Sequence, residues 1–175
     1  MLFRSEILVN AHGERFVRED HPSVHQIERG IYRQPGHRHW AIFDAEMLAK
    51  SEPIIPDWSR DRLANEYQTH PMFSRAMTLE ELAFRAGINA SSLRRNIDDY
   101  NRRQQTAQAD RFGRTHRPMT IEKAPFYAIA MQGWTLVSFA GLSVNRNFQV
   151  LDPQRKAISN LRSEEHTSEL QSPDH

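Results

Sequence analysis

The sequence predicts an α+β fold, with strands near both ends of the chain and helices between them. Residues 123–161 contain two apolar runs rich in aromatic and β-branched side chains, at 126–131 and 134–142, and a third run at 147–151 that alternates. Gly, Pro and Asp residues interrupt these runs every eight to ten positions, which is typical of strands joined by tight connections. A capping box at residues 78–81 marks the start of a helix in the middle of the chain.

The N-terminal segment predicts two short strands, at residues 6–10 and 15–17. His12 and Gly13 lie between them and suit a turn, because glycine tolerates a positive φ. From periodicity alone this is an ordinary edge hairpin.

A helix is expected within residues 21–34, where Val24, Ile27 and Ile31 follow helical spacing and Pro35-Gly36 then stops the pattern. Residues 39–43 predict a strand.

Asp44 is a possible N-cap for a helix that runs to Lys50. Residues 51–60 contain two prolines and predict a loop. Residues 62–75 have weak periodicity and contain Pro71, so no element is expected there.

Two helices are expected after the capping box. In the first, Leu79, Leu82, Ala83 and Ala86 share one face, and Gly87 suits the C-terminal cap. The second begins near Ala90 and places its apolar residues on one face, namely Leu93, Ile97 and Tyr100.

Composition excludes several classes of protein. The 175 residues carry a net charge of +1, which gives no global case for binding nucleic acid or an acidic membrane surface. There is no cysteine, so disulfides and thiolate zinc sites are excluded. No stretch reaches the roughly 18 apolar residues of a membrane helix. We therefore expect no nucleic acid and no membrane as partners, and a cytoplasmic location.

An N-terminal motif comprises residues 7–10, Gly13, Arg15-Phe16 and Glu19. This motif and two later segments resemble those of one flavoprotein family, which includes fumarate reductase, the succinate dehydrogenase flavoprotein subunit, L-aspartate oxidase and 3-ketosteroid 1-dehydrogenase. The segment that leaves the family's capping domain corresponds to residues 125–128, and the turn beside its flavin to residues 138–141.

The resemblance implies an FAD-dependent oxidoreductase that transfers a hydride between flavin and a carbon next to a carbonyl or carboxyl group. Residues 1–136 would form the capping domain of a two-domain flavoprotein. Residues 137–161 would return to the FAD-binding domain as a hairpin over 142–161 with its bend at 149–152. The family's Leu-Tyr-Ala-Ala-Gly-Glu signature should begin at Leu161 and does not appear.

Residues 162–175 are polar, lack a helical or strand period, and predict a disordered tail. Their first eleven residues match the translation of a common sequencing adapter, so we expect this tail to be non-native.

The resemblance makes FAD the expected cofactor, with Ser138, Ala140 and Gly141 against it. From the residues alone, small side chains at Ala140 and Gly141 suit either a flat cofactor or a strand bulge. The chain has no Gly-x-Gly-x-x-Gly motif. We therefore expect parts of its own FAD domain to be missing, and expect the chain alone to bind FAD poorly.

Ser23 occupies the position that carries the family's proton-transferring residue, an Arg in the fumarate reductase branch and a Tyr in the ketosteroid branch. An unperturbed serine is a poor proton donor and a poor base. His21 or His25 could serve instead, since histidine suits proton transfer near neutral pH. Alternatively, water relays through Ser23, Ser23 lines the pocket, or Ser23 only caps a helix. Ser23 and His21 are the expected catalytic residues.

Leu136 and Val137 occupy positions where fumarate reductases carry the polar pair that holds a substrate carboxylate. An apolar pair cannot hold a buried carboxylate, because an unpaired buried charge is costly. We expect a small-molecule substrate that is not a dicarboxylate.

Two alternatives remain open from the residues. Residues 78–103 have the spacing of a helix-turn-helix DNA-binding regulator, although Asp98 and Asp99 on the second helix oppose it. His21 and His25 are four apart, as in some zinc sites, but no carboxylate with matching spacing supports them. No metal is expected.

Overall fold

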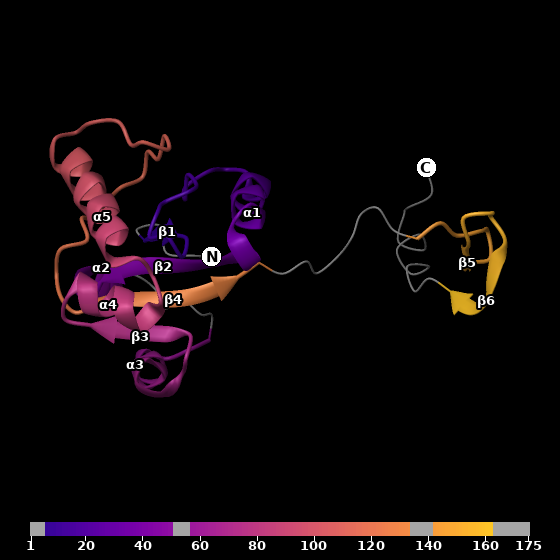
Figure 1. The fold of residues 1–175 in the computed structure, drawn as a ribbon, viewed down its shortest axis with the longest axis horizontal. Coiled ribbons are helices and arrows are strands. Elements are labelled where there is room, and N and C mark those ends of the chain that lie inside the picture. The colour runs from indigo at the N-terminus through magenta and orange to yellow at the C-terminus, as the bar shows by residue number, and fades with distance from the viewer. Residues whose placement is uncertain (1–5, 51–56, 134–141, 163–175) are drawn as a thin grey trace. The chain divides into compact units, whose positions relative to one another are not determined.

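The computed structural model describes residues 6–50, 57–133 and 142–162. The chain divides into two compact units, residues 1–133 and residues 134–175, and each is described by itself (Figure 1). The first unit contains a four-stranded sheet with helices, and the second contains a small two-stranded sheet.

The sheet of the first unit is antiparallel throughout, in the order β1-β2-β4-β3. Its strands are β1 (Ile7–Val9), β2 (Arg38–Asp44), β3 (Phe73–Ala76) and β4 (Phe126–Gln132). The strand β4 is the last of these in sequence and lies between β2 and β3 (Figure 1).

The helices of the first unit lie between its strands in sequence. They are α1 (Val24–Tyr32), the short 3-10 helix η1 (Pro35–His37), α2 (Ala45–Lys50), α3 (Arg60–Thr69), α4 (Leu79–Ala86) and α5 (Ala90–Gln105). The pair α4 and α5 pack on each other, and α4 also contacts β3 and β4.

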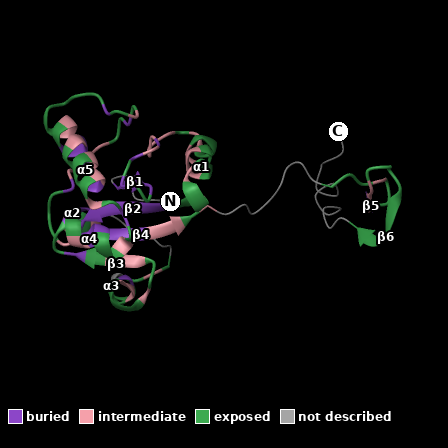
Figure 2. Ribbon diagram, in the orientation of Figure 1, coloured by how far each residue is buried: buried purple, intermediate pink, exposed green. Residues whose placement is uncertain are grey.

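Alternation along the strands divides the core into two clusters. Ile7 and Val9 of β1 belong to the larger cluster, which contains the buried side chains of α4 and α5, whereas Leu8 belongs to a smaller one. The smaller cluster joins Leu8 to Val17 and includes the partly buried Ile27 of α1. Buried residues therefore concentrate in the sheet and on the inner faces of the helices, while α1 has no fully buried residue (Figure 2).

Local signals read from the sequence explain two helix starts. The Thr78 hydroxyl accepts the Glu81 N–H at 3.2 Å, and Gly87, with a φ of +70°, caps the C-terminal end of α4. The Asp44 carboxylate accepts the Met47 N–H at 2.9 Å, so it caps α2 as expected. The Glu81 side chain reaches the Met77 N–H at 3.4 Å, one residue before the position that a capping box requires.

Two elements of the first unit were not expected. The helix α3 is capped by Ser59, whose hydroxyl accepts the Arg62 N–H at 3.1 Å. The sequence did not indicate this helix, because only Leu63 and Tyr67 bring large apolar side chains to the interior, and most other residues of α3 are polar. The strand β3 is only four residues long, and it follows Pro71. Short strands of this kind form by pairing with a neighbour, here β4, and leave little pattern in the sequence.

The N-terminal turn forms as expected, with Gly13 at a φ of +73°. The strand expected over 15–17 is wrong, because only the single bridge between Val9 and Arg15 forms. Beyond that bridge the chain leaves the sheet, and the Arg15 side chain enters a buried ion-pair network.

The second unit pairs β5 (Gln149–Leu151) with β6 (Ala157–Arg162). The expected bend at 149–152 is therefore wrong, because these residues include the strand β5. The chain turns instead on either side of it, where the Asn145 side chain accepts two backbone N–H groups and the Asp152 side chain accepts the Lys156 N–H. Val150 of β5 is buried at 3% exposed, whereas Ile158 and Leu161 of β6 are 40% and 44% exposed, so this small sheet covers only some of its apolar side chains.

Candidate functional site

His21 and Ser23 lie side by side immediately before α1, and both are half-buried. The His21 Nδ1 atom accepts the Ser23 N–H at 3.0 Å, and the Ser23 carbonyl oxygen lies 3.2 Å from the same nitrogen. Ser23 occupies the N-cap position of α1, but its side chain makes no capping hydrogen bond. Ser23 therefore holds the N-cap position only through its backbone, and its hydroxyl does not cap the helix.

This contact fixes how the His21 ring can work. When Nδ1 accepts a hydrogen bond, the neutral ring carries its proton on Nε2. When the ring is protonated, Nδ1 becomes a donor and the Ser23 carbonyl oxygen is within reach as its acceptor. Nδ1 thus has a partner in both states, and Nε2 is the nitrogen that can exchange a proton with a substrate.

The other histidines near this segment are engaged elsewhere. His25 Nδ1 lies 3.1 Å from the Glu28 carboxylate on the exposed side of α1, and His37 Nδ1 lies 3.0 Å from the Tyr32 carbonyl oxygen. His39 is buried beside the Phe16 ring, and this burial lowers its pKa. Within residues 6–50, 57–133 and 142–162, no group of three or more side chains could hold a metal ion.

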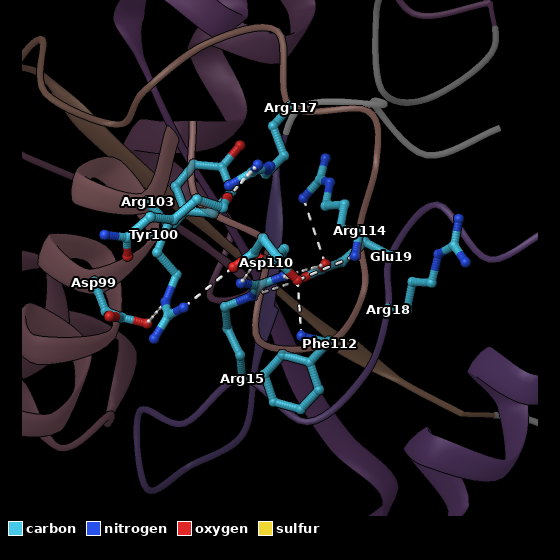
Figure 3. A network of polar contacts seen from close by, with 12 residues as sticks. Arg15, Arg18, Glu19, Asp99, Tyr100, Arg103, Asp110, Phe112, Arg114 and Arg117 are labelled. Atoms are coloured by element: carbon cyan, nitrogen blue, oxygen red, sulfur yellow. Dashed lines mark hydrogen bonds and ion pairs between the residues drawn. The ribbon is translucent and has the colours of Figure 1, made fainter. Parts of the chain in front are cut away.

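A buried charge network lies close in sequence to His21 (Figure 3). The Arg15 guanidinium donates to the Glu19 carboxylate at 2.6 Å and to the Asp110 carboxylate at 2.7 Å. All three side chains are at most 4% exposed. Arg114 donates to the Glu6 carbonyl oxygen at 2.5 Å, so the loop that carries Asp110 and Arg114 is joined to the N-terminal strand region.

Arg15 and Asp110 favour their charged forms although both side chains are buried. Burial alone would lower the Arg15 pKa, but hydrogen bonds and ion pairs to Glu19 and Asp110 outweigh burial and raise it. Burial alone would raise the Asp110 pKa, but the Arg15 guanidinium and the N–H groups of Phe112 and Arg114 lower it below the usual value. The carboxylate and the guanidinium therefore stay ionised together.

Asp20 makes a second connection to the same loop, one residue before His21. One carboxylate oxygen accepts the Thr115 N–H, the Thr115 hydroxyl and the His116 N–H, each at 2.8 Å. The other oxygen accepts from Arg18 at 2.7 Å. Although desolvation acts in the opposite direction, these hydrogen bonds, first among them the one from Arg18, lower the Asp20 pKa.

Sequence reasoning found the parts of this network without their pairing. Arg15 and Glu19 belong to the N-terminal motif, and nothing in the sequence indicates that their side chains meet Asp110. Asp20 was missed altogether. The available signals were the opposite charges of Arg15 and Asp110 and the carboxylate of Asp20 directly before His21.

Acidic side chains pair with three of the four arginines of α5, the helix that a DNA-binding interpretation would place in the groove. Arg94 pairs with Glu80 at 3.5 Å, and both Arg102 and Arg103 pair with Asp99. A cavity of about 320 Å³ lies along α5, but neither His21 nor Ser23 lines it.

The described residues do not form a complete FAD site. Dinucleotide sites place the pyrophosphate at a helix N-terminus after a strand of a parallel sheet, whereas the described sheet of the first unit is antiparallel. The candidates Ser138, Ala140 and Gly141, and the substituted pair Leu136 and Val137, lie outside the described residues.

Comparison with known proteins identifies a family. A family model described as "FAD binding domain" matches residues 3–163. The chain is 27% identical over 155 residues to the probable fumarate reductase Ifc3 of Shewanella frigidimarina, covering 89% of this chain and 24% of that protein. It is also 27% identical over 176 residues to the 4-oxocyclohex-2-ene-1-carboxylate 5-dehydrogenase of Sinomonas cyclohexanicum, covering 89% and 29%.

A solved structure agrees with these relatives. The open conformation of a flavocytochrome c3 fumarate reductase superposes with a TM-score of 0.60 and 27% identity, covering 90% of this chain and 26% of that one. The chain therefore spans about a quarter of the length of these three proteins. None of these matches supports DNA binding. No helix in the described part of the chain has the length and apolar character needed to cross a membrane.

Proposed function

The chain belongs to the FAD binding domain family, and on that premise we propose that it is part of an FAD-dependent oxidoreductase acting on a carbon–carbon bond next to a carbonyl or carboxyl group. The first unit would be the capping domain over the substrate. The cofactor would be held mainly by the dinucleotide-binding half of the protein, which the described residues do not contain. We also propose that the protein acts in the cytoplasm.

We assign proton transfer to His21. Dehydrogenation or reduction of a carbon–carbon bond moves one hydrogen as a proton, so the site needs an acid-base group. The observation that carries this assignment is the contact between His21 Nδ1 and the Ser23 backbone, which leaves Nε2 for the substrate. The Ser23 hydroxyl would line the pocket and hydrogen-bond a polar substrate group, because an unperturbed serine exchanges protons poorly.

The substrate we propose is a small enone or saturated ketone and not a dicarboxylate. Leu136 and Val137 would offer a substrate apolar surface and no partner for a second carboxylate. One relative is named for a dehydrogenase of an oxocyclohexene carboxylate, which combines a ketone with a single carboxylate, and this chemistry is compatible with such a pocket.

A chimera tests the proposal. Residues 3–163 would replace the matched segment of the flavocytochrome c3 fumarate reductase, which supplies the FAD-binding half. Reoxidation of the reduced flavin would then be followed with a cyclic enone and with fumarate. We expect turnover of the enone in preference to fumarate, and His21→Gln should abolish it while the matched change His25→Gln leaves it intact. Fumarate turnover at the parental rate, or full activity of His21→Gln, would contradict the proposal.

A further inference from the structure

We propose that Asp20 is a positioning residue, which holds the His21 ring in place by tying its backbone to the loop over residues 110–116. The inference rests on the proposed role of His21 in proton transfer. It starts from the observation that two segments far apart in sequence, residues 15–20 and residues 110–116, are joined by two separate carboxylates, Asp110 and Asp20.

The two carboxylates belong to different segments, and each accepts hydrogen bonds from the other segment. Asp110 belongs to the loop and accepts from Arg15 of the N-terminal segment, as well as from the N–H groups of Phe112 and Arg114 in its own loop. Asp20 belongs to the N-terminal segment and accepts from Thr115 and His116 of the loop. The segment is thus fixed at both ends, and the second fixed point directly precedes His21.

The loop itself is anchored to α5, so it is a firm base for this connection. Arg103 of α5 donates to the Ala109 carbonyl oxygen at 3.1 Å, and Gln104 donates to the Arg117 carbonyl oxygen at 2.8 Å. These contacts hold the loop on both sides of residues 110–116. A displacement of Asp20 therefore requires three hydrogen bonds to a fixed loop to break.

Hydrogen bonds of the backbone and the ring hold His21 next to the fixed Asp20. Its N–H donates to the Arg18 carbonyl oxygen at 3.2 Å, and its Nδ1 atom meets the Ser23 backbone. No contact between Asp20 and the His21 ring is needed, because Asp20 sets the backbone from which the ring projects. Proton transfer depends on such placement, since an error of about 1 Å can cost on the order of a hundredfold in rate.

The first experiment needs neither flavin nor substrate. The 175-residue chain, labelled with nitrogen-15, would be compared with Asp20→Ala, Asp20→Asn and the exposed control Asp98→Asn. In Asp20→Ala, we expect amide exchange at Thr115 and His116 to rise about tenfold or more. We also expect the His21 ring nitrogens to change from the Nε2–H pattern towards a mixture of both tautomers. Asp20→Asn keeps one oxygen acceptor and should show a smaller change, and Asp98→Asn should show none.

Two outcomes would overturn the inference. If the ring nitrogens of His21 keep the Nε2–H pattern while exchange at Thr115 and His116 rises, Asp20 holds only the loop. If exchange rises equally at all amides in both Asp20 variants, the residue serves global stability and does not position His21.

A kinetic measurement in the chimera separates this inference from the proposed function. Asp20→Ala should lower kcat about tenfold or more and leave KM unchanged, with partial recovery in Asp20→Asn. An equal loss of kcat in both variants, or an effect on KM alone, would contradict positioning. If the chimera turns over no enone, the proposed function fails, whereas the nitrogen-15 result still decides whether Asp20 orders His21.

Discussion

Arg15 and Asp110 are 95 positions apart in sequence and form an ion pair at 2.7 Å in which neither side chain is more than 4% exposed. Arg15 also bonds Glu19 and lies over the rings of Tyr100 and Phe112. One guanidinium therefore joins the N-terminal motif, α5 and the loop after α5.

Removal of Asp110 should strongly destabilise the first unit. Asp110→Ala leaves Arg15 with one carboxylate partner instead of two, in a buried position, and loss of a partner from a buried ion pair costs about 3–5 kcal/mol. The control Asp99→Ala removes pairs with Arg102 and Arg103 that are largely on the surface, where the cost is about 0–1 kcal/mol. Urea unfolding measures both values, and equal losses in the two variants would contradict the buried network.

The stability of the chain should depend on the ionisation of Asp20. Its folded-state pKa lies below the ordinary value of 3.8, so its contribution is complete above that value. As the pH falls below 3.8, the unfolded state takes up a proton first and the contribution is lost. The advantage of the native chain over Asp20→Asn should therefore be about 2 kcal/mol near neutral pH and should shrink towards about pH 2. Urea midpoints across this range measure it, and a constant difference would show that ionisation of Asp20 does not matter.

Two glycines with a similar backbone conformation should respond differently to substitution by alanine. At Gly13, a Cβ atom would lie 2.6 Å from both the Asn89 carbonyl oxygen and the Leu93 nitrogen, so strain and overlap together should cost about 3 kcal/mol or more. At Gly87, nothing lies within 4 Å of such an atom, and only the positive φ costs about 1 kcal/mol. Thermal unfolding of Gly13→Ala and Gly87→Ala measures the difference. Similar values would mean that the N-terminal turn does not pack tightly on α5.

The 175-residue chain should retain little FAD after desalting. The antiparallel sheet of the first unit provides no site for the pyrophosphate, and binding along one edge of the flavin would recover little burial against an undiminished entropy cost. Visible spectra before and after desalting measure retention. A stoichiometric flavin band would show that the site is complete within these residues.

Local signals allowed much of the first unit to be predicted from the sequence. Short-range patterns in the sequence indicate the strands around Leu8 and Ile42, the capping residues Thr78 and Asp44, and the inner face of α5. The family was also predictable, because its motifs are contiguous. The helix α3 escaped prediction because it has few apolar residues, and its stability comes from packing on β3 and β4.

The candidate site could be predicted only in part. His21 and Ser23 follow from their position after Glu19, but the contact between the His21 ring and the Ser23 backbone depends on the turn that precedes α1. The contact between Asp20 and the loop was hidden because two of the four donors to its carboxylate are backbone N–H groups, 95 and 96 positions away. The type of a residue does not indicate whether its backbone N–H group will bind a distant side chain.

The position of β4 in the sheet has a consequence for synthesis of the protein. β4 (Phe126–Gln132) pairs with both β2 and β3, which are not neighbours in the sheet. A nascent chain that has emerged only as far as Ala124 can pair β1 with β2, but β3 then has no strand to join. The sheet of the first unit can therefore be completed only after Gln132 has left the ribosome, and until then β2 and β3 lack the strand that joins them.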